Sequence, residues 1–336
     1  MDLLNAFIVF ANFVLIPATA YGAQLALGAL GVTLIYGILR FSNFAHGDTM
    51  AFGAMATILI TWWLQSVGVS FGPLPTALLA LPFGIAITAA FMLGTDRVVY
   101  RFYRAQKAKP IILVMVSLGV MFIMNGLVRF IIGPDDQRFA DGERFIISVR
   151  DFKALTGLEQ GLAIRTTQGI TVITAVIVVI ALFWFLNRTR TGKSMRAYSD
   201  NEDLALLSGI NPERVVMITW LIVAALATVA GVLYGLDKSF KPFTYFQLLL
   251  PIFAAAIVGG LGSPLGAIAG GFVIAFSEVM ITYAWKRVAT YALPESLAPE
   301  GLAQLLSTDY KFAVSFGILL IVLLFKPTGL FAGKSV

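Results

Sequence analysis

The strongest constraint in this sequence is a series of long apolar runs separated by short polar segments. About 20 apolar residues suffice for a helix to cross the hydrocarbon core of a bilayer. Backbone polar groups in that core must be paired internally, which a helix achieves. The runs therefore predict an all-α polytopic membrane protein with about eight to ten transmembrane helices. They lie at 3–20, 21–39, 43–64, 73–95, 110–132, 169–187, 215–236, 244–258, 264–285 and 310–326.

The composition supports a membrane protein and excludes several classes of function. Of the 336 residues, 59% are hydrophobic and 12% are charged, whereas a soluble domain carries about 25% charged residues. The net charge of +6 is explained by basic cytoplasmic loops, so we expect no nucleic acid as partner. The chain has no cysteine and one histidine. A disulfide, a thiol nucleophile and a multi-histidine metal site are therefore excluded, and we expect no metal, no cofactor and no catalytic residue.

Two regions leave alternatives open. Run 3–20 contains Asn5 and Asn12, and almost no polar gap separates it from the next run. Because its apolar character continues past a signal-peptide-like stretch with no basic residue before it, we expect it to be retained, whether or not it spans the membrane by itself. Run 244–258 is short for a crossing. Together with 264–285 it forms either two spans or a re-entrant segment followed by a helix.

The distribution of charge predicts the sidedness of the loops. Segment 96–109 carries five basic residues and one acid, so it is expected in the cytoplasm. Segment 133–168 carries five basic residues and six acids and is expected outside, as is 286–309. The loop 188–214 then falls inside, and the alternation ends with a cytoplasmic C-terminus near Lys326.

The whole chain, 1–336, is expected to form a single transmembrane domain, because its longest polar stretches have the length of loops. Segment 26–37 (ALGALGVTLIYG) is similar to segment 225–235 (ALATVAGVLYG) with one gap. By the predicted topology the two segments cross in opposite directions, as in an inverted repeat. Chance recurrence of small apolar residues in membrane helices explains the similarity equally well.

The cytoplasmic loop 188–214 is expected to contain a short helix. Ser199 or Asp200 can cap its N-terminus, and Glu202 suits its positively polarised first turn. Gly209 can end the helix. The loop thus has the features of an ordered element rather than of a plain connector.

The same loop bears on partners and on ATP. Leu204 and Leu207 give the short helix an apolar side, which favours docking to a cytosolic partner. Asn211 can cap the membrane helix that follows. The triplet 192–194 (GKS) looks like the end of a phosphate-binding loop, but the position that requires the first glycine is Asn187. We therefore reject ATP binding by this chain.

Polar residues inside or beside the apolar runs are candidates for a translocation path. Asn43 can cap the helix that follows it. His46 and Asp48 can form a proton relay, although a polar helix start that pairs free backbone N–H groups is the simpler interpretation. Glu278 lies inside its run, away from both ends, and an intramembrane carboxylate usually faces a cavity or a partner. Arg129 is a candidate counter-charge, so a structural ion pair and a path-lining carboxylate both remain open.

The glycine-rich turn between runs 244–258 and 264–285 is a further candidate for the translocation path. Gly259, Gly260 and Gly262 are followed by more glycines at short intervals. Unwound backbone of this kind can face a translocation path, and closely spaced glycines also permit close helix packing. Packing is the simpler interpretation.

Five segments, taken in order, resemble a known family. They are 43–48 (NFAHGD), 207–211 (LSGIN), 230–233 (AGVL), 258–267 (VGGLGSPLGA) and 326–330 (KPTGL). The chain resembles the permease subunits of high-affinity branched-chain amino-acid ABC importers, and it is most similar to the smaller of their two permeases. The resemblance extends from about residue 21 to residue 332.

The resemblance implies a bacterial inner-membrane protein with no enzymatic activity of its own. Its implied partners are a second related permease, two cytosolic ATPase subunits, a periplasmic binding protein and the lipid bilayer. ATP binding closes the ATPase pair, and the short cytoplasmic helix transmits that motion. The implied coupling residues are Ser199, Asp200, Asn201, Glu202, Leu204, Ala205, Leu207 and Gly209.

The substrate and two departures from the family pattern stay open at this stage. Similar permeases move branched-chain or other amino acids, amides or urea, and a hydrophobic amino acid is the default. Run 3–20 is more apolar than the usual start, and segment 286–309, with Pro294 and Pro299, looks longer than usual. The rival hypotheses are a proton-coupled secondary transporter that uses Asp48, His46 or Glu278, and a structural or channel-like protein.

Overall fold

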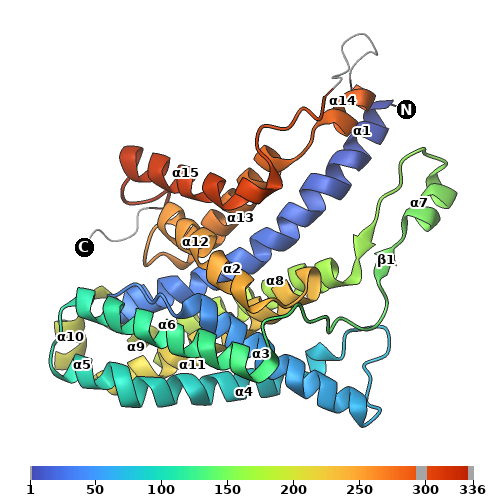
Figure 1. Ribbon diagram of the computed structural model, residues 1–336. Coiled ribbons are helices and arrows are strands. Elements are labelled where there is room, and N and C mark those ends of the chain that lie inside the picture. Colours follow the sequence, from blue (N-terminus) through green and yellow to red (C-terminus); the bar gives the residue numbers. More distant parts are fainter. Residues whose placement is uncertain (1, 293–300, 332–336) are drawn as a thin grey trace.

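The protein is a bundle of long helices, as the computed structural model shows for residues 2–292 and 301–331 (Figure 1). Eight helical stretches among these residues are long and apolar enough to cross a membrane, which confirms the prediction of an all-α polytopic membrane protein. The long helices are α1 (Asp2–Phe10), α2 (Ile16–Leu39), α3 (His46–Ser66), α4 (Ala77–Thr95), α6 (Pro110–Ile132), α8 (Thr166–Arg188), α11 (Pro212–Lys238), α12 (Pro242–Gly259), α13 (Pro264–Thr282) and α15 (Lys311–Phe325).

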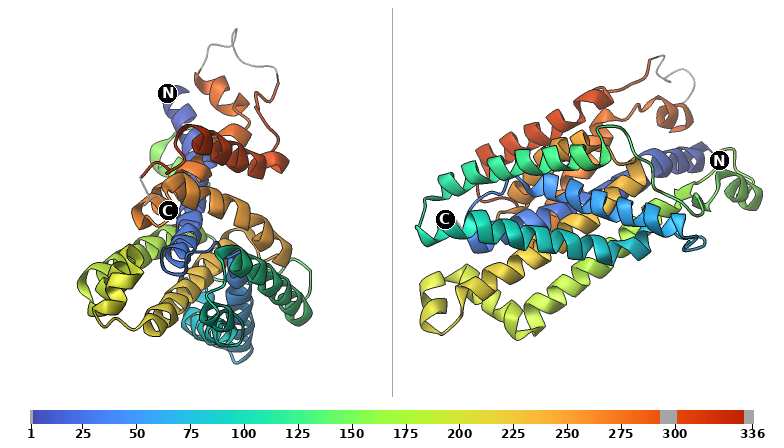
Figure 2. Two further views of the ribbon diagram at one scale, coloured as in Figure 1. Left: turned by 90° about the vertical axis from the view of Figure 1, so that its left-hand side faces the viewer. Right: turned by 60° about the horizontal axis from the view of Figure 1, so that its bottom comes forward.

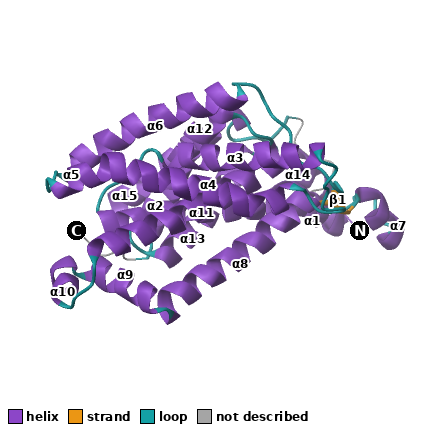
Figure 3. Ribbon diagram, turned by 90° about the horizontal axis from the view of Figure 1, so that it is seen from below, coloured by secondary structure: helices purple, strands orange, loops and turns teal. Residues whose placement is uncertain are grey.

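Shorter elements cover the two ends of the bundle. They are α5 (Arg101–Ala105), α7 (Val149–Thr156), α9 (Arg190–Asp200), α10 (Glu202–Leu207), α14 (Lys286–Ala292) and the antiparallel strands β1 (Phe145–Ile147) and β2 (Ile164–Arg165). Helices α5, α9 and α10 lie at one end, and α7, α14 and the start of α1 lie at the other (Figure 3). Following the distribution of basic residues, we call these the inner end and the outer end.

The first two apolar runs form one continuous helical stretch rather than two spans. Leu3–Leu39 is 37 residues long, which corresponds to roughly 55 Å of helix and exceeds the roughly 30 Å hydrocarbon core. Ala11–Leu15 is a π-helical segment, and Pro17 follows in the first turn of α2. Because proline lacks the N–H that would continue the α-helical ladder, the wider turn occurs where that bond is missing.

The two asparagines of the first run bind the outer loop. Asn12 Nδ2 donates to the Gly161 carbonyl at 2.6 Å, and Asn12 Oδ1 accepts from the Ala163 amide at 2.8 Å. Asn5 Oδ1 accepts from the Gln160 amide at 3.2 Å. These polar side chains therefore fix the outer loop to the part of the helix that projects from the bundle.

The outer segment 286–309 is described in part. Helix α14 packs against α1, and a short 3₁₀ turn, Thr308–Tyr310, leads into α15. The expectation about Pro294 and Pro299 lies outside the described residues.

Helices α12 and α13 form an antiparallel pair, so the two-span alternative is the one the structure shows. Helix α12 is continuous over 18 residues and packs along α13. A Cβ atom on Gly270 would lie 2.0 Å from the Ala255 carbonyl oxygen, and one on Gly259 would lie 2.0 Å from the Gly266 oxygen. The glycines therefore bring the two backbones into contact, as in small-residue packing of membrane helices.

Helix α2 lies at the centre of the bundle. It packs against α8, α11, α12 and α13, and almost all its side chains from Ala18 to Ile35 are buried. The left panel of Figure 2 shows the other helices arranged around it. The similar segments 26–37 and 225–235 fall in α2 and α11, which pack against each other; the inverted repeat itself stays a prediction.

A carboxylate joins three elements at the outer end. Asp141 accepts hydrogen bonds from the Thr76 amide at 2.7 Å, the Thr76 hydroxyl at 2.6 Å and the Gln65 amide at 2.9 Å. Partial burial by itself would raise the pKa of Asp141, but these hydrogen bonds hold the pKa below its ordinary value. The ends of α3 and α4 and the outer loop are therefore connected through an ionised side chain.

Substitution of Gly270 by alanine is expected to destabilise the α12–α13 pair. The added methyl group meets the rigid backbone of Ala255, and overpacking of this kind costs about 1 to 3 kcal/mol. Thermal unfolding of the purified protein in detergent measures the effect. The matched control is Gly119→Ala, because nothing lies within 4 Å of a Cβ atom at Gly119. Equal melting temperatures for the two variants would contradict the close-contact argument.

The Asp141 contacts are expected to make stability depend on pH. Because the pKa of Asp141 is lower in the folded state, its stabilisation is complete above the unfolded pKa of about 3.9 and is lost as pH falls through the folded value. Asp141→Asn should therefore lower the melting temperature near neutral pH, and the difference from the unmodified protein should shrink near pH 3. Asp135→Asn, at an exposed carboxylate with no hydrogen bond among the described contacts, is the control. A pH-independent difference would argue against this role.

Candidate functional site

Loop 188–214, predicted to be cytoplasmic, contains two helices rather than one. Thr189 caps α9 by accepting a hydrogen bond from the Gly192 amide at 3.0 Å. Asn201 caps α10 by accepting from the Leu204 amide at 3.0 Å. The prediction that Ser199 or Asp200 caps the short helix is therefore wrong. Both residues belong to the last turn of α9, and the extended backbone that a cap requires occurs at Asn201 (φ −155°, ψ 109°).

Helix α10 presents leucines to solvent. Leu204 is 60% exposed and Leu207 is 85% exposed, whereas Ala205 is 3% exposed and faces the protein. Gly209 ends the helix with φ +80°, a conformation that glycine adopts without steric cost. The expected cap of α11 is confirmed, since Asn211 accepts from the Arg214 amide at 3.2 Å.

Two contacts fix α9 and α10 to each other and to the bundle. Arg40 at the end of α2 donates from Nη2 to the Ser199 carbonyl oxygen at 2.5 Å. The Tyr198 hydroxyl donates to Glu202 Oε1 at 2.6 Å. Burial and the Glu202 carboxylate raise the pKa of Tyr198, so the hydroxyl stays protonated and remains the donor. Ser199 and Glu202, both predicted coupling residues, are thus connected to the central helix.

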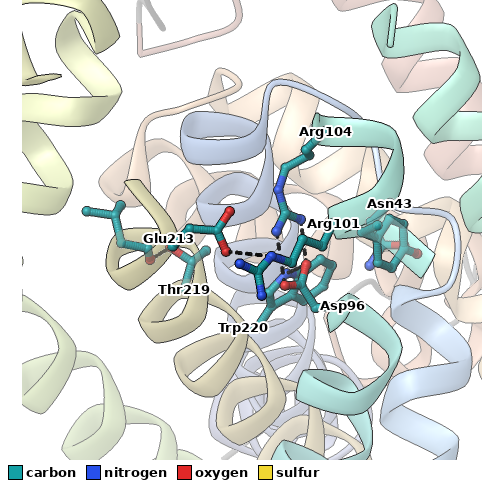
Figure 4. A network of polar contacts seen from close by, with 9 residues as sticks. Asn43, Asp96, Arg101, Arg104, Glu213, Thr219 and Trp220 are labelled. Atoms are coloured by element: carbon teal, nitrogen blue, oxygen red, sulfur yellow. Dashed lines mark hydrogen bonds and ion pairs between the residues drawn. The ribbon is translucent and has the colours of Figure 1, made fainter. Parts of the chain in front are cut away.

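An ionic network joins the inner ends of α4 and α11 (Figure 4). Asp96 accepts two hydrogen bonds from the Arg104 guanidinium, at 2.5 and 3.0 Å, and one from Trp220 Nε1 at 2.7 Å. Arg101 lies 3.4 Å from Glu213 of α11. Asp96 is 8% exposed, and a buried carboxylate needs such partners. The sequence analysis missed this network; its signal was the single acid among the basic residues of 96–109.

Aromatic rings continue this network toward Asn43. Tyr100 stacks on Trp220 with ring centroids 5.2 Å apart and lies 5.6 Å from the ring of Phe41. The Tyr100 hydroxyl donates to Asn43 Oδ1 at 3.4 Å. Asn43 also accepts from the Ala45 amide at 3.1 Å. It therefore closes the turn before α3 and does not cap the helix as predicted, because α3 begins only at His46.

His46 and Asp48 point to different neighbours. His46 is fully buried and packs against α2, where a Cβ atom on Gly31 would lie 2.4 Å from its ring. Asp48 Oδ1 accepts from Asn125 of α6 at 2.7 Å. Residues two apart on a helix do not face each other, and no contact among the described residues joins this pair. The geometry therefore gives no direct proton relay between them.

The glycine turn lies at the inner end, far along α13 from Glu278. The Leu330 amide donates to the Val258 carbonyl at 2.8 Å, and the Phe331 amide donates to the Gly259 carbonyl at 3.1 Å. Gly260 and Gly262 have φ values of +110° and +83°, which explains the residue type at these positions. The turn is thus paired with the chain segment that follows α15.

Glu278 lies one turn from the outer end of α13 and is 2% exposed. The expectation that it stands away from both ends is wrong, because the helix stops at Thr282. No ion pair joins Arg129 to Glu278 among the described residues, and the Arg129 guanidinium lies 5.8 Å from the centroid of the Phe243 ring. Instead, the Ser315 hydroxyl donates to Glu278 Oε1, and Lys311 lines the same cavity.

Two of the cavities at the outer end contain charged side chains of both signs. One has a volume of 430 Å³ and lies between α2, α11, α13 and α15, with Glu278 in its wall. The other has a volume of 560 Å³ and is lined by charged residues of both signs from the outer loop and the end of α11. Lys238 lines both cavities. Sequence reasoning missed this arrangement because the lining residues come from distant parts of the chain.

Comparison with known proteins identifies the family. The family described as branched-chain amino acid transport system / permease component matches residues 15–323. The chain belongs to this family. The high-affinity branched-chain amino acid transport system permease protein LivH of Escherichia coli (strain K12) is 31% identical over 315 residues, which cover 92% of this chain and 91% of LivH. The corresponding protein BraD of Pseudomonas aeruginosa is 29% identical, with 94% of each chain covered. A probable LivH of Methanocaldococcus jannaschii is 29% identical, with 81% of each covered.

Membership in the branched-chain amino acid transport permease family confirms the resemblance seen in the sequence motifs. The protein is a multi-pass membrane transport permease, and its family is one of transport components rather than of catalytic enzymes. The proton-coupled secondary transporter is not favoured, because the relatives are permeases of this family over nearly their whole length. The family match over residues 15–323 also agrees with the extent of the resemblance inferred from the motifs.

Breaking the inner network is expected to destabilise this permease strongly. Arg104→Leu leaves the buried Asp96 carboxylate without its charged partner, which costs about 3 to 5 kcal/mol. The measurement is thermal unfolding in detergent. Arg97→Leu, at an exposed arginine on the same segment, is the matched control and should leave the melting temperature nearly unchanged. Equal melting temperatures for Arg104→Leu and the control would show that the Asp96–Arg104 ion pair does not stabilise the protein.

Proposed function

We propose that this permease is the membrane-spanning subunit of an ATP-driven importer in the bacterial inner membrane, and that it carries branched-chain or other hydrophobic amino acids. The names of its relatives LivH and BraD support the substrate class. Urea, amides and other amino acids are the alternative substrates within the same family. The proposed partners are two cytosolic ATPase subunits, a second related permease and a periplasmic binding protein.

The observation that carries the proposal is the position of α10 at the inner end. Leu204 and Leu207 project from it, and exposed apolar side chains of this kind mark a protein interface. The right panel of Figure 2 shows α9 and α10, in yellow, projecting beside α5 at the end away from the N-terminus. A partner bound to these leucines can therefore move an element that is connected to the bundle.

The contacts of the loop supply a mechanical route from that partner to the central helix. A displacement of α10 acts on Tyr198 through Glu202 and on Arg40 through Ser199. The neighbouring Arg101–Glu213 ion pair connects the inner ends of the α4 segment and α11. We therefore assign coupling to Ser199, Asp200, Asn201, Glu202, Leu204, Ala205, Leu207 and Gly209, with Asn201 and Gly209 defining the ends of α10.

The proposed path residues fall into an inner and an outer group. Asn43, His46 and Asp48 lie at the inner start of α3, and both ring nitrogens of His46 are buried without a hydrogen-bond partner among the described residues. Such unpaired groups support a position where solute or water approaches. Gly259 supports the path indirectly through its close contact with Gly266 of α13, and Gly260 and Gly262 do so by forming the positive-φ turn between α12 and α13. Glu278 belongs to the outer group.

Charges placed on the exposed leucines are expected to separate the permease from its ATPase. Leu204→Asp together with Leu207→Asp should abolish co-purification of the ATPase and uptake of radiolabelled L-leucine, because a charge buried at an interface is costly without a partner. The melting temperature of the membrane part should not change, since both side chains face solvent.

The matched control is Leu155→Asp, at a leucine that is 87% exposed on α7 at the opposite end. It should leave co-purification and uptake intact. Retained ATPase association in the double variant would refute the coupling assignment. Uptake that survives removal of the ATPase genes and stops with a proton uncoupler would refute the ATP-driven importer itself.

A further inference from the structure

The 430 Å³ cavity at the outer end combines features that point to one class of ligand. Its volume falls in the range of small-molecule sites, about 300 to 1,000 Å³. Its walls come from α2, α11, α13 and the start of α15, so four separate parts of the chain converge on it. Helices α2, α13 and α15 lie next to one another in Figure 1.

One side of the cavity carries a carboxyl group whose hydrogen-bonding capacity is incompletely satisfied. Glu278 accepts a hydrogen bond from Ser315 on Oε1, but Oε2 is buried and has no partner among the described residues. The Tyr21 hydroxyl, in the same wall, is buried beside the Glu278 carboxyl and has no partner within strict hydrogen-bond geometry among the described residues. Buried polar groups in folded proteins are nearly always paired. A ligand that donates hydrogen bonds, such as an ammonium group, would satisfy both oxygens.

A second side of the cavity carries cations. Lys311 is the first residue of α15, and its Nζ lies 5.9 Å from the Tyr21 ring centroid. No carboxylate of the described chain lies within salt-bridge distance of Lys311, whereas Lys238 is paired with Asp237 at 3.4 Å. Lys311 is attracted by the nearby Glu278 carboxyl and its Nζ lies 4.7 Å from the Phe312 ring centroid, but it has no ion pair at contact distance among the described residues, so its ammonium can receive a ligand carboxylate.

Much of the remaining wall is apolar, with Phe13, Pro17 and Val279 in it. Thr282, Gln304 and Thr308 add hydrogen-bonding groups to the lining. A solute with a single charge would meet one group of the wrong sign, and a neutral solute such as urea would leave both charges unused. A solute with an ammonium group, a carboxylate and an aliphatic side chain matches all three surfaces.

We propose that this cavity is an access site for zwitterionic amino acids, in which Glu278 and Tyr21 receive the α-ammonium group, Lys311 receives the α-carboxylate, and the apolar wall receives the side chain. The inference rests on the proposed function and narrows it, because it excludes urea and simple amides. Lys238 also lines the 560 Å³ charged cavity, so the proposed site lies next to that cavity at the outer end, the side from which we expect the solute to enter.

The lack of cysteine in the natural sequence makes a direct test available. Thr308 lines the cavity and is exposed, so Thr308→Cys in the full chain, within the assembled transporter in membranes, can be labelled from outside by an impermeant maleimide. L-Leucine, titrated to saturation, should slow this labelling about tenfold when the site is about nine-tenths occupied. Neither 4-methylpentanoate, which lacks the ammonium group, nor leucinol, which lacks the carboxylate, should protect.

Charge-removing variants assign the two ends of the ligand. In the Thr308→Cys background, Glu278→Gln and Lys311→Gln should each abolish protection by L-leucine, provided that the melting temperature is retained; if either variant fails to fold, the ligand series alone decides. Leu155→Cys on α7 is the control and should label at the same rate with and without L-leucine.

The outcomes separate this site from the proposed function. If cells take up L-leucine but L-leucine does not protect Thr308→Cys, or if both analogues protect equally well, the site is refuted and the importer stands. If cells with the unmodified chain do not take up L-leucine, the proposed function fails as well. Protection by added phosphatidylethanolamine, with none by L-leucine, would assign the cavity to a lipid headgroup and overturn the proposal.

Discussion

The structure depends on the close packing of α2 at the centre of the bundle. In a bilayer, apolar side chains gain little by leaving lipid for protein, so helices associate through close contact of small residues. Helix α2 contacts α8, α11, α12 and α13, and its Gly31 lies directly against the buried ring of His46. Because these four helices all pack against α2, a displacement of α2 would change the packing of each of them.

This central position gives the inner-end contacts their importance. Arg40 ends α2 in a left-handed conformation, φ +57°, which costs roughly 1 to 2 kcal/mol for a residue other than glycine. In that conformation its guanidinium reaches the Ser199 carbonyl of α9. The network around Asp96 holds α4 to α11 beside it. The cytoplasmic loop is therefore connected to the core by charged and hydrogen-bonded groups rather than by an apolar contact.

The outer end follows a different principle, because its polar groups are not fully paired. Asp96 at the inner end has three donors, whereas Glu278 at the outer end has one oxygen without a partner among the described contacts. A satisfied carboxylate favours one fixed arrangement, and an unsatisfied one favours a ligand. By this contrast, Asp96 stabilises the fold of the permease, and Glu278 is the carboxyl group proposed to bind its solute.

The sequence by itself determined the all-α membrane class, the exposed Leu204 and Leu207 and the cap at Asn211, because hydrophobic run length and caps are local signals. The sidedness of the loops stays a prediction from the basic residues. Tertiary structure decided that the first two runs are one helix, that Asn201 rather than Ser199 or Asp200 caps α10, and that Glu278 meets Ser315 rather than Arg129. The partners of a buried side chain depend on which helices pack together and on how far each helix is shifted along its axis relative to its neighbour. That choice is made by contacts between residues far apart in the chain, such as Glu278 and Ser315, which no local pattern encodes.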